Sequence, residues 1–92
     1  MNENENTIES TGEQIALTQM RAGQRGKIVE IVGGCNLVSK LEAFGIRKNR
    51  EIKKISEQWM KGPVLLQHGH SQVALGFKMA SRIIVRVTGD GQ

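Results

Sequence analysis

Short runs of apolar residues, each ended by glycine or by polar residues, recur along most of this chain. Four β-branched residues surround one glutamate in residues 27–32, and two glycines end that run. Residues 64–67 and 72–75 flank a glycine, and residues 83–88 place apolar side chains at alternate positions. Such runs between glycines are typical of strands. The sequence predicts strands in these four segments and a fifth, half-exposed strand over residues 52–57, where two isoleucines lie among lysines.

One segment follows a helical period instead. Leu37, Leu41 and Phe44 occupy positions i, i+4 and i+7, which form one stripe of an amphipathic helix. Asn36 suits the N-cap, and Gly45 suits the left-handed residue that ends many helices. We predict an α-helix over residues 36–44 whose apolar stripe packs onto the sheet.

Two shorter segments, residues 18–20 and 78–82, suit single helical turns. Many short strands in a chain of 92 residues indicate a small barrel, because a barrel leaves few exposed strand edges. The predicted fold class is mainly β: a small β-barrel of about five strands, with one inserted α-helix and short helical turns.

The charge is distributed unevenly along the chain. Residues 1–14 hold four glutamates and no basic residue, and they carry little apolar area to offset the entropy of ordering. We therefore expect an acidic tail over residues 1–14, a folded domain over 15–88 and a short tail over 89–92. Residues 15–92 then hold 13 basic and five acidic residues, a net charge of +8. Such a domain suits an acidic protein surface, anionic lipid or nucleic acid, although solubility alone explains the charge equally well.

The expected location is the cytoplasm. No apolar run exceeds three residues, and no basic region followed by an apolar stretch opens the chain. The single cysteine excludes an internal disulfide framework and fits a reducing compartment.

His68 and His70 are the first candidates for chemistry. Alternate residues of a strand share a face, so both could bind one metal ion, with Cys35 as the only other soft ligand. Zinc and similar ions usually need roughly three or four protein ligands, and Gly69 favours a turn with two surface histidines. We predict no metal site and no cofactor, with these three residues as the weak candidates.

Catalysis is not predicted. No histidine accompanies Cys35 in sequence, no two carboxylates stand in a shared apolar context, and no glycine-rich phosphate loop occurs. The chain is expected not to be an enzyme.

Two features predict a docking role. A basic cluster follows the predicted helix and continues into the next strand; its members are Arg47, Lys48, Arg50, Lys53 and Lys54. Trp59 and Met60 form an apolar pair in a predicted loop, and tryptophan is enriched at protein interfaces. The alternatives are a solvated basic face and an apolar lid over one end of the barrel.

The pattern as a whole resembles the ferrous iron transport protein A (FeoA) family. The matching stretches are LTQM (17–20) with Gly23, GKI (26–28), LEAFGI (41–46), EI (51–52), GPV (62–64), VALG (73–76) and MASRIIV (79–85). The sequence departs from the family at Lys48 and Asn49, where members typically have Pro-Gly, and at Gly76, where many have arginine. Because asparagine tolerates positive φ, the turn at Asn49 is expected to survive.

The resemblance implies a small cytosolic SH3-like domain that acts beside FeoB, a membrane transporter whose cytosolic part carries a GTP-binding domain. Iron-dependent repressors of the DtxR type end in a similar domain, but they also carry a helix-turn-helix. The first hypothesis is thus an accessory or regulator of ferrous iron uptake that binds FeoB. A small basic nucleic-acid-binding barrel and a metal carrier are the alternatives, and weak self-association is left open.

Overall fold

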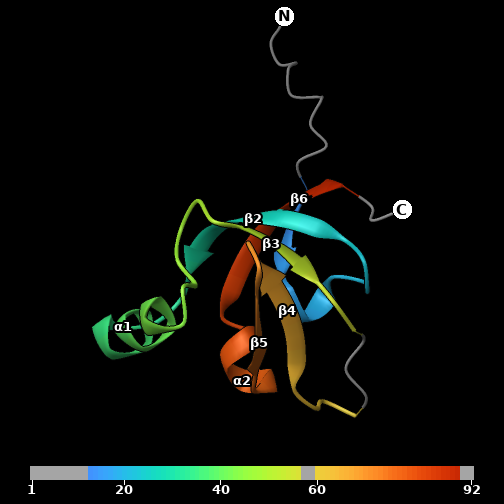
Figure 1. The fold of residues 1–92 in the computed structure, drawn as a ribbon. Coiled ribbons are helices and arrows are strands. Elements are labelled where there is room, and N and C mark those ends of the chain that lie inside the picture. The colour runs from blue at the N-terminus through green and yellow to red at the C-terminus, as the bar shows by residue number, and fades with distance from the viewer. Residues whose placement is uncertain (1–12, 57–59, 90–92) are drawn as a thin grey trace, which may run out of the picture.

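The computed structural model describes residues 13–56 and 60–89, which form a curved antiparallel sheet with helices at its margins (Figure 1). In chain order the elements are β1 (Gln14–Ala16), η2 (Leu17–Gln19, a 3-10 helix), β2 (Arg25–Ile31), α1 (Cys35–Ala43), β3 (Glu51–Lys54), β4 (Val64–His68), β5 (Ser71–Leu75), α2 (Phe77–Ala80) and β6 (Ile83–Gly89). The strands pair in the order β1-β6-β2-β3-β4-β5. The predicted mainly β fold class is confirmed.

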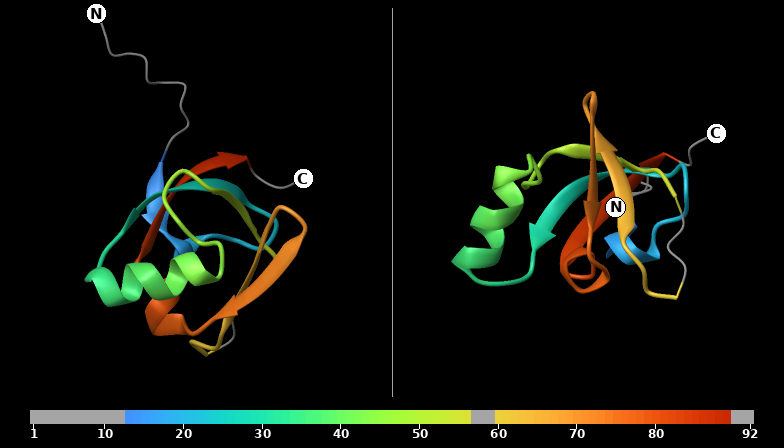
Figure 2. Two further views of the ribbon diagram at one scale, coloured as in Figure 1. Left: turned by 60° about the vertical axis from the view of Figure 1, so that its left-hand side comes forward. Right: turned by 60° about the horizontal axis from the view of Figure 1, so that its bottom comes forward.

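The strands curl around one core, while α1 stands to one side of the sheet (Figures 1 and 2). Register shifts between β2 and β6 fall at Arg25/Gly26 and at Ile28/Glu30, and irregularities of this kind bend a sheet. The buried apolar side chains are Leu17, Met20, Ile28, Leu41, Ile46, Ile52, Val64, Leu66, Leu75, Ala80, Ile83 and Val85. The core therefore draws on nearly every element of the described chain.

The strand β1 is the element that the sequence pattern does not reveal. It has three residues, too few to show an alternation. It exists through its pairing with β6, where Gln14 opposes Arg86 and Ile15 opposes Val85. Gln14, assigned to the tail from sequence, thus belongs to the sheet. Gly89, assigned to the other tail, ends β6, and the Glu13 carbonyl oxygen accepts a hydrogen bond from the Val87 amide at 2.9 Å. Residues 1–12 and 90–92 of the two expected tails lie outside the described residues.

The helix α1 is confirmed, but its predicted stripe is wrong at one end. Leu41 is fully buried and Leu37 packs against the core, whereas Phe44 is 48% exposed. Phe44 is the C-cap residue, and Gly45 follows it with φ of 85°. The amides of Gly45 and Ile46 donate to the carbonyl oxygens of Glu42 and Leu41, both at 2.9 Å.

These paired bonds form a Schellman motif, which reverses the chain direction after the helix. The reversal brings Ile46 into the core, where it is fully buried and takes the place predicted for Phe44. The N-cap is Gly34, two residues before the predicted Asn36, and the helix begins at Cys35.

The turns that the sequence marks are present. Asn49 has φ of 73°, and its amide donates to the carbonyl of Ile28 at 2.7 Å, which ties the turn to β2. Gly69 has φ of 60° in the two-residue turn between β4 and β5, as the first position of a type II′ hairpin requires.

Candidate docking surface

Lys54 does not belong to a surface, and this corrects the predicted basic cluster. Its side chain is fully buried, and Nζ donates to the carbonyl oxygens of Met20 at 2.6 Å and Thr18 at 3.3 Å. Successive residues of a strand point to opposite faces, so when Lys53 faces solvent Lys54 must face the core. Lys54 therefore stabilises the end of η2 and cannot contact a partner.

Lys53 lies on the solvent-facing side of the sheet among cations that are distant in sequence. Lys53 on β3 opposes Arg25 on β2. Lys27, two residues further along β2, opposes Arg86 on β6. Residues that oppose each other across strands share a face. Arg25, Lys53 and Arg86 are exposed and Lys27 is partly exposed. We call Arg25, Lys27, Lys53 and Arg86 the outer-face strip.

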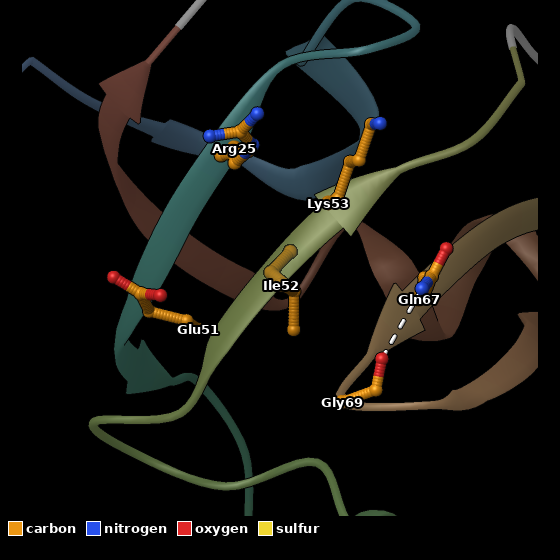
Figure 3. A pocket seen from close by; sticks show the side chains of 6 residues that line it. All are labelled: Arg25, Glu51, Ile52, Lys53, Gln67 and Gly69. Atoms are coloured by element: carbon orange, nitrogen blue, oxygen red, sulfur yellow. Dashed lines mark hydrogen bonds between the residues drawn. The ribbon is translucent and has the colours of Figure 1, made fainter. Parts of the chain in front are cut away.

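A shallow pocket of about 160 Å³ opens at one end of this strip (Figure 3). Its lining residues are Arg25, Glu51, Ile52, Lys53, Gln67 and Gly69. Figure 3 shows Arg25 and Lys53 rising from adjacent strands, with Glu51 further along β3. Across β4, the Gln67 Nε2 donates to the carbonyl oxygen of Gly69 at 3.1 Å. The pocket is thus lined by a guanidinium and an ammonium group from adjacent strands and by one carboxylate, so its net charge is positive and suits an anionic ligand group.

The remaining members of the predicted cluster form a second basic group in the turn between α1 and β3. Arg47 and Lys48 are exposed and Arg50 is partly exposed. They line a surface hollow of about 380 Å³ together with Asn49 and Glu51. Since Glu51 also lines the pocket on the strip, the two basic groups adjoin each other. The basic surface is therefore broader than the sequence indicated, without Lys54.

Met60 is the most exposed large apolar residue described, at 81% exposure. It has φ of 53° and precedes Lys61, whose φ is 61°, in the turn before β4. Trp59, its predicted companion, lies outside the described residues. The role of either side chain as an anchor stays a prediction.

The weak metal candidates lie in two places, the two histidines at the β4–β5 hairpin and Cys35 on α1. His68 ends β4, with Nε2 2.9 Å from the carbonyl oxygen of Phe44, and His70 is exposed in the hairpin turn. Cys35 is exposed at the start of α1, the end opposite Phe44, and a helix of that length spans about 13 Å. Within residues 13–56 and 60–89, no three His, Cys, Asp or Glu side chains gather in a way that could hold a metal ion.

Sequence reasoning missed Arg25, Lys27 and Arg86 as members of the basic surface. The sequence did contain a signal for them: Gly26 separates Arg25 from Lys27, and Arg86 follows the apolar Val85. In a strand, this alternation places all three cations on the outer face. The strand order was the missing information. It brings β6 beside β2 and so joins residues some 60 positions apart in the chain.

The comparison with models of protein families shows which family this chain belongs to. The model of the FeoA domain matches residues 15–87, which is most of the chain. The chain belongs to the FeoA family. The family is associated with ferrous iron transport, and the match covers every strand and helix described above apart from the ends of β1 and β6.

Solved structures agree with this assignment. The crystal structure of an iron uptake regulatory protein (FeoA) is 29% identical, with a TM-score of 0.78 over 83% of this chain and 100% of that one. A FeoA-like protein from Clostridium acetobutylicum is 22% identical, with a TM-score of 0.74 over 87% of this chain and 93% of its own.

A manganese-dependent transcriptional repressor shares the fold at 18% identity and a TM-score of 0.76, over 84% of this chain and 43% of that one. No curated protein matches the chain. Among the helices of the described residues, none has the length and apolar character needed to cross a bilayer.

Proposed function

We propose that this FeoA domain is a non-catalytic accessory protein of ferrous iron uptake that binds the cytosolic part of a FeoB-type transporter. The family match over residues 15–87 carries the proposal, since it covers the whole folded domain. The 29% identical structure, an iron uptake regulatory protein that the domain covers end to end, supports it.

The surface described above suits such a role. The loop cations Arg47 and Lys48 are exposed, and oppositely charged surfaces accelerate association more than they raise final affinity. An exposed methionine adds apolar area that a partner can desolvate, and a few such anchors carry most of the energy of an interface. We assign steering to the loop cations and anchoring to Met60 with Trp59.

Binding kinetics on the immobilised cytosolic part of the transporter test this proposal. Met60→Ser and Trp59→Ala should each weaken binding by more than about tenfold, because truncating an anchor typically costs about 2 kcal/mol. The matched control is Val32→Ser, which removes the apolar side chain of another exposed residue, 46% accessible and directly after β2. It should change the affinity by less than about twofold.

Circular dichroism of each variant reports whether the fold is retained. Unfolding by Trp59→Ala would make Trp59 a core lid, and Met60→Ser would then carry the test alone. If the wild-type domain shows no binding to the transporter even at low salt, the proposal is wrong.

A nucleic-acid-binding domain is the second candidate, because exposed cations can also contact phosphates. Phosphate contacts release counterions, so affinity would fall steeply with salt. Titration of a mixed-sequence RNA at rising salt distinguishes the two functions: tight RNA binding with a steep salt slope, and none to the transporter, would favour this candidate.

A further inference from the structure

We propose that the outer-face strip is a docking surface for an extended acidic segment of a partner protein. This inference rests on the proposed function and adds two details to it: the partner's segment is acidic, and it contacts the outer face of the sheet. The strip adjoins the loop cations at Glu51 but differs from them in its members, which come from β2, β3 and β6.

Folding alone does not account for the strip. Arg25 opposes Lys53, and Lys27 opposes Arg86, so two pairs of like charges face each other directly across strands. Like charges in this position destabilise a sheet. Glu51, opposite Lys27, is the acidic neighbour that the register supplies. Within the described part of the chain, none of the four cations makes a hydrogen bond or ion pair through its side chain. The four cations are therefore available to an anionic partner.

The spacing of the cations points to an extended polypeptide. Arg25 and Lys27 are two residues apart on one strand, which separates them by about 6.6–6.8 Å. Acidic residues at alternate positions of an extended peptide repeat at the same distance. A segment that lies along β2 can thus place one carboxylate at each cross-strand pair of cations, and each arginine can bind a carboxylate through two hydrogen bonds.

The same face suits nucleic acid less well. Single-stranded nucleic acid gains much of its affinity by stacking bases on aromatic side chains, and the described aromatics, Phe44 and Phe77, lie on α1's end and on α2. Glu51 opposes Lys27 at one end of the strip. A phosphate backbone carries charge at every unit and would meet this carboxylate, whereas a peptide can leave that position uncharged.

The test measures how tightly a fluorescent peptide of alternating glutamate and serine binds the full-length protein. Fluorescence anisotropy gives the affinity at low ionic strength and at about 0.15 M. The same peptide with glutamine in place of glutamate controls for backbone binding. The full-length double variant Arg25→Gln/Lys53→Gln should bind the glutamate peptide about fivefold to tenfold more weakly than the wild type. The matched variant Arg47→Gln/Lys48→Gln loses the same charge from the loop and should lose less than about twofold.

Amide chemical shifts locate the contact independently of affinity, and peptide should shift the amides of β2 and β3. Equal loss of affinity in the two double variants would show that net charge alone attracts the peptide, and would overturn the proposal. Tighter binding of RNA than of peptide through the same residues would also overturn it, as would occupation of the strip by the acidic N-terminal residues of the chain itself. Because the peptide is not the transporter, this result stands or falls separately from the proposed function.

Discussion

At the scale of single residues, two adjacent lysines lie in opposite environments. Lys53 faces solvent beside Arg25, while Lys54 is fully buried and donates to the carbonyl oxygens of Met20 and Thr18. A buried ammonium is tolerated only when its donors are satisfied, and here the end of η2 supplies the acceptors. Lys54 is therefore part of the core, although its charge suggests a surface residue.

Replacing Lys54 by methionine should lower the free energy of unfolding by about 1–3 kcal/mol. The substitution keeps most of the side-chain volume but leaves buried carbonyl oxygens without their donor. Urea denaturation measures the change. Lys53→Met on the exposed face is the control and should not lower the free energy of unfolding, because it leaves no buried acceptor without a donor and removes a charge that faces Arg25. Equal stability of the two variants would mean that the buried bonds of Lys54 contribute nothing.

At the scale of elements, the joint between α1 and β4 depends on a left-handed glycine. Gly45 has φ of 85°, and a Cβ at this position would lie 2.5 Å from the His68 ring carbon Cε1. The His68 ring is held there by the contact of its Nε2 with the carbonyl oxygen of Phe44. The C-terminal end of α1 and the end of β4 therefore pack closely against each other at Gly45 and His68.

Gly45→Ala should destabilise the domain through two separable effects. The left-handed conformation costs a residue with Cβ about 1–2 kcal/mol, and contact with the imidazole adds to that cost. A double-mutant cycle separates them: in a His68→Ala background Gly45→Ala should cost less, because only the backbone effect is left. Equal costs in the two backgrounds would show that the ring moves aside freely.

At the scale of the whole molecule, strand order concentrates positive charge on one face of the sheet. The strands β6, β2 and β3 are adjacent, so cations that are dispersed in the sequence become neighbours. A surface with this composition attracts anions over a distance comparable to the Debye length, about 8 Å at physiological salt. The repulsion between the opposed cations lowers the stability of the folded domain.

Lys53→Gln should therefore raise the free energy of unfolding by about 0.2–1 kcal/mol at low salt, because it removes the repulsion from Arg25. The gain should shrink as salt is added and should be absent in an Arg25→Gln background. Thermal unfolding at several salt concentrations measures both effects. A loss of stability, or a gain that persists without Arg25, would show that the two cations do not repel each other in the folded state.

The sequence by itself determined the mainly β class, the position of α1 and the turns at Asn49 and Gly69. These features depend on local physics: the period of apolar side chains and the few residue types that accept positive φ. It also identified the exposed loop cations Arg47 and Lys48, because their segment contains nothing that could be buried.

Tertiary structure decided what depends on pairing. The strand β1 exists only against β6, Ile46 replaced Phe44 in the core because the Schellman turn redirects the chain, and Lys54 is buried because strand alternation points it inward beside η2. The outer-face strip likewise requires β6 to lie next to β2. Local propensity cannot specify which strands become neighbours, since that choice is made by burying one shared core, and the same choice sets which charges meet on the opposite face.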